Sequence, residues 1–151
     1  MNPQISLVEP DDYPELVAVW EDSVRATHDF LQEADIQYFK PLILNTYLDA
    51  VELRCVKDAQ GSILGFSGVA EGNLEMLFIH SEARGQGIGK ALLNHAIEAL
   101  LVRKVDVNEQ NDQALGFYLH AGFRIVSRSE RDASGKPYPI LHMELNMDHK
   151  A

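Results

Sequence analysis

The pattern of apolar and polar residues is clearest between Leu74 and Leu101. Residues 74–79 are apolar apart from Glu75, which predicts a largely buried strand. Residues 80–83 form a polar break, and beyond Gly87 apolar residues return with the spacing of one helical face. That face consists of Ile88, Leu92, Ala96 and Leu100, with Ala91, Leu93, Ile97 and Leu101 beside it. The stretch therefore predicts a strand, a loop and an amphipathic helix in succession.

The same criteria divide the rest of the chain into further elements. Apolar runs and alternation predict six more strands, at residues 4–9, 53–57, 63–69, 104–107, 123–129 and 140–147. Three more helices are predicted. One is capped by Asp11 or Asp12 and ends near Thr27 or His28, one covers residues 36–47 with a kink or a break at Pro41, and one runs from a cap at Asn111 to Gly122.

The order of these elements, β-α-α-β-β-β-α-β-α-β-β, predicts an α/β fold. Residues 74–107 read as strand–helix–strand, which is expected to be a right-handed crossover between parallel strands. Turn residues at 58–61 and 71–73 join antiparallel neighbours instead. We therefore expect a mixed, mostly antiparallel, twisted sheet of about seven strands with helices on both faces. The length, without a linker or repeat, indicates a single domain over residues 1–151.

Composition narrows the possible partners. The formal net charge of -10 argues against nucleic acid, which requires a basic face, and weakly favours a cationic acceptor such as an amine. No apolar run approaches the roughly 20 residues of a membrane span, and the first ten residues lack the features of a signal peptide. The single Cys55 cannot form an intrachain disulfide and is expected in the core. We expect a cytoplasmic protein without a nucleic-acid or membrane partner.

Three glycines occur where the central strand passes into its helix: Gly85, Gly87 and Gly89. Glycine inside a helix costs about 1 kcal/mol relative to alanine, so this run indicates close approach of the backbone either to a ligand or to the neighbouring strand. Free N–H groups and the helix dipole favour an anion there, and Arg84 and Lys90 add positive charge. A P-loop would need Ser or Thr at Ala91, and the dinucleotide fingerprint would need glycine at Lys90. Both of these motifs are therefore excluded.

The remaining pattern, Arg84-x-x-Gly87-x-Gly89, resembles the acyl-CoA pyrophosphate loop of the GNAT superfamily of N-acetyltransferases. A second motif resembles the same superfamily and consists of Asn111, Ala114, Phe117, Tyr118, Gly122 and Phe123. The resemblance covers residues 4–147. It is strongest to a small bacterial branch with which the chain shares the stretches ATHDFL, VNEQN and GKPYP.

The resemblance implies an N-acetyltransferase that moves an acetyl group directly from acetyl-CoA to a primary amine. The backbone of Leu77, Phe78 and Ile79, in a strand with a bulge, would pair with the pantetheine arm. The pyrophosphate would be held by Arg84, Gly85, Gln86, Gly87, Ile88, Gly89 and Lys90. Asn111 would contact the cofactor near its pantetheine end. Tyr118 would act as general acid for the departing thiolate, which leaves readily because peptide thiols have a pKa of about 8.5.

Several assignments stay open. The base that deprotonates the ammonium is Glu75, His28 or a chain of water molecules. The acceptor side is expected from the first two helices and the link 133–139, with His28, Asp29 and Tyr138 as substrate-binding candidates. The histidines lack metal-ligand spacing, so no metal is expected. A non-catalytic acyl-CoA sensor is the alternative function, since a sensor needs no acid at the sulfur. A third hypothesis, a nucleotide-binding protein, is disfavoured because the glycine loop matches neither the P-loop nor the dinucleotide fingerprint.

Overall fold

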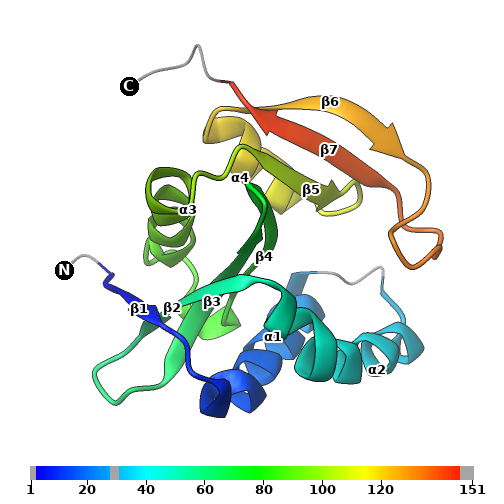
Figure 1. The fold of residues 1–151 in the computed structure, drawn as a ribbon. Helices are drawn as coiled ribbons and strands as arrows, with labels where there is room; N and C mark the ends of the chain where they lie inside the picture. The colour runs from blue at the N-terminus through cyan, green and yellow to red at the C-terminus, as the bar shows by residue number, and fades with distance from the viewer. Residues whose placement is uncertain (1–2, 28–30, 147–151) are drawn as a thin grey trace. The chain divides into compact units, whose positions relative to one another are not determined.

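The computed structural model describes residues 3–27 and 31–146, and these divide into two compact units, Met1–Val102 and Arg103–Ala151 (Figure 1). The first unit contains β1 (Ile5–Leu7), α1 (Tyr13–Thr27), α2 (Glu33–Leu42), β2 (Glu52–Lys57), β3 (Ile63–Ala70), β4 (Asn73–Ile79) and α3 (Ile88–Ala99). The second contains β5 (Lys104–Asn108), α4 (Asp112–His120), β6 (Phe123–Ser129) and β7 (Ile140–Leu145). The predicted order of helices and strands is confirmed. The single domain over the whole chain stays a prediction.

The first unit is a sheet with a helix against each face. Its strands follow the order β1-β2-β3-β4, and each neighbouring pair is antiparallel. In β4, Met76 and Phe78 pack with the α1 residues Leu16 and Trp20, whereas Leu77 and Ile79 pack with Ile88 and Leu92 of α3. Both helices contact β3 and β4, from opposite sides (Figure 1). Alternation along one strand thus builds two separate apolar clusters.

Gly65 of β3 brings the start of α3 close to the sheet. A Cβ atom at this position would lie 2.8 Å from Ile79 Cδ1 and 3.1 Å from Ile88 Cγ2. A larger residue here would require the Ile79 and Ile88 side chains to shift, so glycine lets Ile88 pack closely against β3. The first turn of α3 is therefore fixed against β3.

The central strand carries the predicted bulge, but at Glu75 rather than within Leu77–Ile79. Val69 pairs with Leu74 and Gly68 with Met76, so Glu75 is an extra residue without a cross-strand partner. The bulge lets Leu74 and Met76 face opposite sides of the sheet although they are two residues apart. It also explains an acidic residue in an apolar strand, because Glu75 is exposed.

Two further sequence predictions are confirmed in this unit. The second helical region is divided, because α2 ends one residue after Pro41 and a π-helical turn, Ile43–Tyr47, follows. Proline lacks the N–H that a regular helix requires, which accounts for the break. Cys55 is fully buried in the core, and burial raises the pKa of its thiol.

The second unit is a three-stranded antiparallel sheet of order β5-β7-β6 with α4 on one face. Its α4 face is apolar and is formed by Val105, Val107, Phe123, Leu141 and Met143, all buried. The opposite face carries Asp106, Ser127, Ser129 and His142, as the strand register requires. A shift of register between Ile125 and Ser127 marks a bulge in β6.

Candidate functional site

The predicted pyrophosphate residues occupy one continuous loop and the first turn of α3. Gly87 is the N-cap of α3 with φ 81° and ψ 9°, and Gly85 has φ 78°. Both angles lie in the left-handed region, which glycine adopts at little cost. The first intrahelical hydrogen bond runs from the Ala91 N–H to the Gly87 carbonyl at 3.0 Å. The helix itself therefore provides no acceptor for the N–H groups of residues 88–90.

The positive end of α3 is not neutralised by its own sequence. Its first turn contains no acidic residue and Gly87 provides no side-chain cap. The first turns of the other α-helices in the described chain contain Glu15 in α1, Glu33 and Asp35 in α2, and Asp112 in α4. Acidic residues in these positions stabilise a helix through its dipole. Their absence from α3 favours a bound anion at this end.

The loop leaves room for such an anion. An ideal Cβ atom at Gly85 or Gly87 would meet no atom within 4 Å. Arg84, Gln86 and Lys90 are exposed, so two cationic side chains flank the open space. Ile88 is buried in the α3 cluster, which means that it can offer only its backbone N–H. This region can therefore bind a phosphate through backbone groups and adjacent charge.

Asp22 of α1 holds the loop that leads from β4 to Arg84. Its carboxylate accepts hydrogen bonds from the Ser81 N–H at 2.6 Å and from the Ser81 hydroxyl at 3.1 Å. Burial raises the pKa of Asp22, but the Ser81 hydrogen bonds and the electrostatic effects of the nearby His80 and Arg84 outweigh it and hold the pKa below its usual value. Asp22 is thus ionised at neutral pH and anchors the loop. The sequence analysis missed this residue, because its helical position gave no sign of the partner.

The other cofactor candidates in this unit are the last three residues of β4. Leu77, Phe78 and Ile79 pair with β3 through Ser67, Phe66 and Gly65. The ring of Phe78 also lies 5.8 Å from that of Phe66, centroid to centroid. Because β4 is the last strand of this unit, only one edge of β4, the one next to β3, is paired within the unit. Glu75 lies before these residues at the bulge, and its carboxylate accepts a hydrogen bond from the Asn73 side-chain amide.

A cavity of about 510 Å³ lies beside the same loop. Its lining comes from α1, from the β2–β3 hairpin and from the loop, and comprises Glu15, Ala18, Val19, Asp58, Ser62, Ile63, Leu64, His80, Glu82, Ala83 and Gln86. Glu15 accepts a hydrogen bond from the Ile63 N–H at 2.8 Å, and Asp58 accepts one from the Ser62 N–H at 2.9 Å. The carboxylates would repel phosphate, so we assign the anion to the start of α3 and not to this cavity.

In the second unit, Asn111 and Tyr118 lie on the same helix. The Asn111 side-chain oxygen accepts a hydrogen bond from the Ala114 N–H at 3.1 Å, which confirms the predicted cap of α4. Tyr118 is buried, and its ring makes edge-on contacts with Phe117 and Phe123 at centroid distances of 5.1 and 5.7 Å. Burial raises the pKa of Tyr118 above its ordinary value. The hydroxyl therefore keeps its proton at neutral pH.

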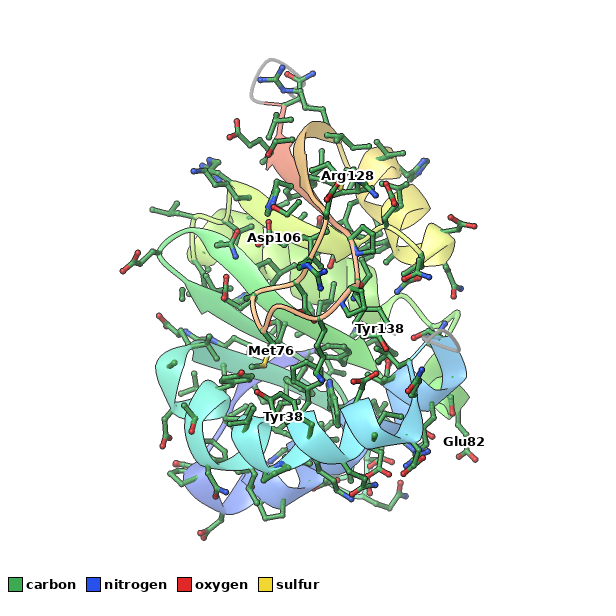
Figure 2. The ribbon with its side chains drawn as sticks, turned by 90° about the vertical axis from the view of Figure 1, so that its right-hand side faces the viewer. Tyr38, Met76, Glu82, Asp106, Arg128 and Tyr138 are labelled. Carbon is green, nitrogen blue, oxygen red and sulfur yellow. The ribbon has the colours of Figure 1, made fainter. Side chains whose placement is uncertain are left out.

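The loop before α4 is tied to the rest of this unit. Arg128 of β6 donates two hydrogen bonds to the Glu109 carboxylate, at 2.7 and 3.0 Å, and these lower the pKa of Glu109. The Glu109 N–H also donates to the Pro139 carbonyl at 2.9 Å. Tyr138 precedes Pro139 in the β6–β7 link and is partly buried; Figure 2 labels it. Asn108 has a buried side-chain oxygen without a partner among the described residues, a feature that sequence reasoning missed.

Two candidates for the acceptor side, His28 and Asp29, lie outside the described residues. The helices on either side of them are joined by an ion pair, in which Arg25 of α1 contacts Glu33 of α2 at 2.7 Å. Lys40 of α2 also contacts Glu21 of α1 at 2.6 Å. Two ion pairs therefore join α1 to α2.

Two searches of the described residues bear on other classes of function. Over residues 3–27 and 31–146, no group of three or more His, Cys, Asp or Glu side chains is arranged to hold a metal ion. Within the same ranges, no helix has both the length and the hydropathy needed to span a membrane.

Comparison with known proteins gives consistent similarities. A sequence profile described as "Acetyltransferase (GNAT) domain" matches residues 25–147. The "Peptidyl-lysine N-acetyltransferase YjaB" of Salmonella typhimurium is 41% identical over 128 residues, which are 85% of this chain and 88% of the relative. The solution structure of apo-form YjaB from Escherichia coli matches with a TM-score of 0.85 and 36% identity, over 95% of this chain and 97% of that chain.

A more distant structure shares the fold. It is the PaiA N-acetyltransferase from Thermoplasma acidophilum, solved in complex with coenzyme A, with a TM-score of 0.69 and 19% identity over 95% of this chain and 99% of that chain. These similarities confirm the predicted fold class. The match to YjaB also confirms the bacterial branch indicated by the shared sequence stretches.

Proposed function

The chain belongs to the GNAT family of N-acetyltransferases, and on that premise we propose that it transfers an acetyl group directly from acetyl-CoA to the side-chain amine of a peptidyl lysine. We also propose that the two units form one acetyltransferase domain. The family profile supports this because its match, residues 25–147, includes parts of both units.

The start of α3 is the observation that carries the proposal. Three backbone N–H groups without a helical acceptor, an open space at two left-handed glycines and two flanking cations suit a pyrophosphate. A distant neighbour of the same fold was solved with coenzyme A, which supports coenzyme A as the class of ligand. Arg84, Gly85, Gln86, Gly87, Ile88, Gly89 and Lys90 would hold the diphosphate. The backbone of Leu77, Phe78 and Ile79, and the side chain of Asn111, would contact the pantetheine arm.

Tyr118 would supply the proton for the leaving group. When acetyl-CoA is bound it supplies an activated thioester, whose thiolate leaves as the amine attacks the carbonyl carbon. A phenol that burial keeps protonated can donate to that thiolate. A sensor that only binds acyl-CoA would need no such donor, so the role of Tyr118 separates the two functions.

The attacking ammonium must first lose a proton. Glu75 is our candidate base, because the bulge projects an exposed carboxylate from the strand whose end is assigned to the cofactor. His28 or a chain of water molecules remains the alternative. The net charge of -10 favours a cationic acceptor. The relatives of this branch are named as peptidyl-lysine acetyltransferases, which makes lysine our choice of acceptor. His28, Asp29 and Tyr138 would contact it.

The test is release of free CoA thiol from acetyl-CoA in the presence of different amines. A peptide with one lysine and a blocked N-terminus should support turnover, whereas the same peptide with acetyl-lysine should not. Spermidine and a peptide with a free N-terminus but no lysine serve as competing acceptor classes. Thiol release with spermidine or the lysine-free peptide, but not with the lysine peptide, would reject peptidyl lysine as the acceptor. Calorimetric binding of acetyl-CoA without thiol release for any amine would reject the enzyme in favour of the sensor.

A further inference from the structure

Three polar side chains form a chain of hydrogen bonds across the sheet of the second unit. Asp106 Oδ1 lies 2.7 Å from His142 Nδ1, and His142 Nε2 lies 2.6 Å from Ser129 Oγ. The residues come from β5, β7 and β6, and Figure 2 labels Asp106 on its strand. Acetyl transfer as proposed above assigns no role to any of them.

The strand register brings the three residues to one face. Asp106 and His142 are direct cross-strand partners, and Ser127 is the partner of His142 on the other side. Ser129, two residues further along β6, points to the same face as Ser127. The bulge at Val126 is essential here, because without the extra residue Val126 would be opposite His142 and both serines would face α4.

The partners of His142 determine where its protons are. A carboxylate can only accept a hydrogen bond, so the Nδ1–H of His142 donates to Asp106. In the neutral form of the ring, Nε2 then carries the lone pair and can accept the hydrogen bond from the Ser129 hydroxyl. A hydroxyl next to a base that is oriented by a carboxylate is the arrangement that activates serine as a nucleophile.

The group is also accessible. The side chains of His142 and Asp106 are 34% and 50% exposed, so a small molecule can reach them. Solvent screens the Asp106–His142 pair at this exposure, so Ser129 should react far more slowly than the serine of a buried catalytic triad.

We propose that Ser129 is a nucleophile that is acylated by small activated esters, with His142 as its base and Asp106 as a positioning residue. Ser129 Oγ attacks the ester carbonyl carbon while His142 Nε2 takes the hydroxyl proton. The bond from the carbonyl carbon to the leaving oxygen then breaks, and the alcohol leaves with a proton from the imidazolium. Water attacks the acyl-serine with His142 again as base, which releases the carboxylic acid and restores Ser129.

The experiment treats the full chain with p-nitrophenyl acetate, without CoA or amine, and follows nitrophenol release and the acetylated peptide by mass spectrometry. A fluorophosphonate is the second probe, because its adduct is not hydrolysed and accumulates even when the acetyl-serine turns over quickly. Ser127→Ala is the matched control, since Ser127 is an exposed serine on the same strand. Thermal melting confirms that each variant is folded.

We expect both probes to label Ser129 in the wild type and in Ser127→Ala, and neither to label this position in Ser129→Ala. Ser129→Cys should restore acylation through its thiol. His142→Gln should slow labelling by roughly 10²-fold, the usual contribution of a general base, at an unchanged melting temperature. Asp106→Asn should slow it by a smaller factor. Labelling confined to lysines, equal labelling of Ser127 and Ser129, or a rate that is unchanged in folded His142→Gln would overturn the proposal.

Discussion

Replacing Gly87 by asparagine tests the anion site at the start of α3 with limited damage to the fold. Asparagine tolerates the left-handed region better than most residues, and the open space at Gly87 accommodates its Cβ. Gly61, in the β2–β3 turn, provides the matched control, because its φ of 83° is close to the 81° of Gly87 and it is equally open. We expect both variants to lose about 1 kcal/mol of unfolding free energy.

The two variants should differ in their affinity for acetyl-CoA. Three N–H groups are available at residues 88–90, and each hydrogen bond to a charged phosphate contributes about 1.5–3 kcal/mol. Loss of even one such bond in Gly87→Asn should weaken binding by roughly 10- to 150-fold, since about 1.4 kcal/mol corresponds to a factor of ten. Gly61→Asn should bind like the wild type. Isothermal titration calorimetry measures the affinity and thermal melting the stability. Wild-type affinity in a folded Gly87→Asn protein would refute the pyrophosphate assignment.

Three further substitutions test other parts of the site. Tyr118→Phe should lower kcat by roughly 10²-fold or more in steady-state thiol release, with little change in acetyl-CoA affinity or melting temperature, because volume is conserved. Glu75→Gln should lower kcat/KM by a similar factor if Glu75 is the base, and its exposure predicts less than about 0.5 kcal/mol of lost stability by chemical denaturation. Asp22→Asn should lower the free energy of unfolding by about 1 kcal/mol at pH 7, a figure reduced to allow for solvent screening of the partly exposed Asp22 side chain. The folded-state pKa of Asp22 is lowered, so the stability difference between wild type and Asp22→Asn should be fully present above the unfolded-state pKa of about 3.9. It should vanish as the pH falls through the folded-state pKa of Asp22. Chemical denaturation at a series of pH values measures this difference.

The elements that the sequence predicted correctly are those governed by neighbours along the chain. Asn111 caps α4 through an amide three residues away, and the break after Pro41 follows from a missing N–H. The glycine loop is local as well, because Gly85 and Gly87 adopt backbone angles that other residues avoid. Such features depend on residues close together in the sequence, so they can be predicted without the tertiary structure.

The features that the sequence did not predict depend on register or on distant partners. The hydrogen bonds of Asp22 reach Ser81, 59 residues away, and those of His142 reach Asp106, 36 residues away. The bulge was expected within Leu77–Ile79 and occurs at Glu75, because its place depends on which residues of β3 pair with which residues of β4. The catalytic roles of Tyr118 and Glu75 stay predictions, since geometry around one residue does not establish its part in a reaction.

The extra residue at Glu75 has a consequence for insertions and deletions. In a regular strand, removal of one residue exchanges the two faces of everything that follows, which would bring Leu77 and Ile79 to the α1 side and Met76 and Phe78 to the α3 side. Deletion of Glu75 instead makes Leu74 and Met76 neighbours in sequence. Their cross-strand partners, Val69 and Gly68, are already neighbours, so the pairing of both residues is kept. Both apolar clusters would keep their members. Within β4 the chain can therefore lose this residue without moving an apolar side chain to the wrong face, so the fold places no constraint on strand length at Glu75 and only the proposed role as a base would retain the residue.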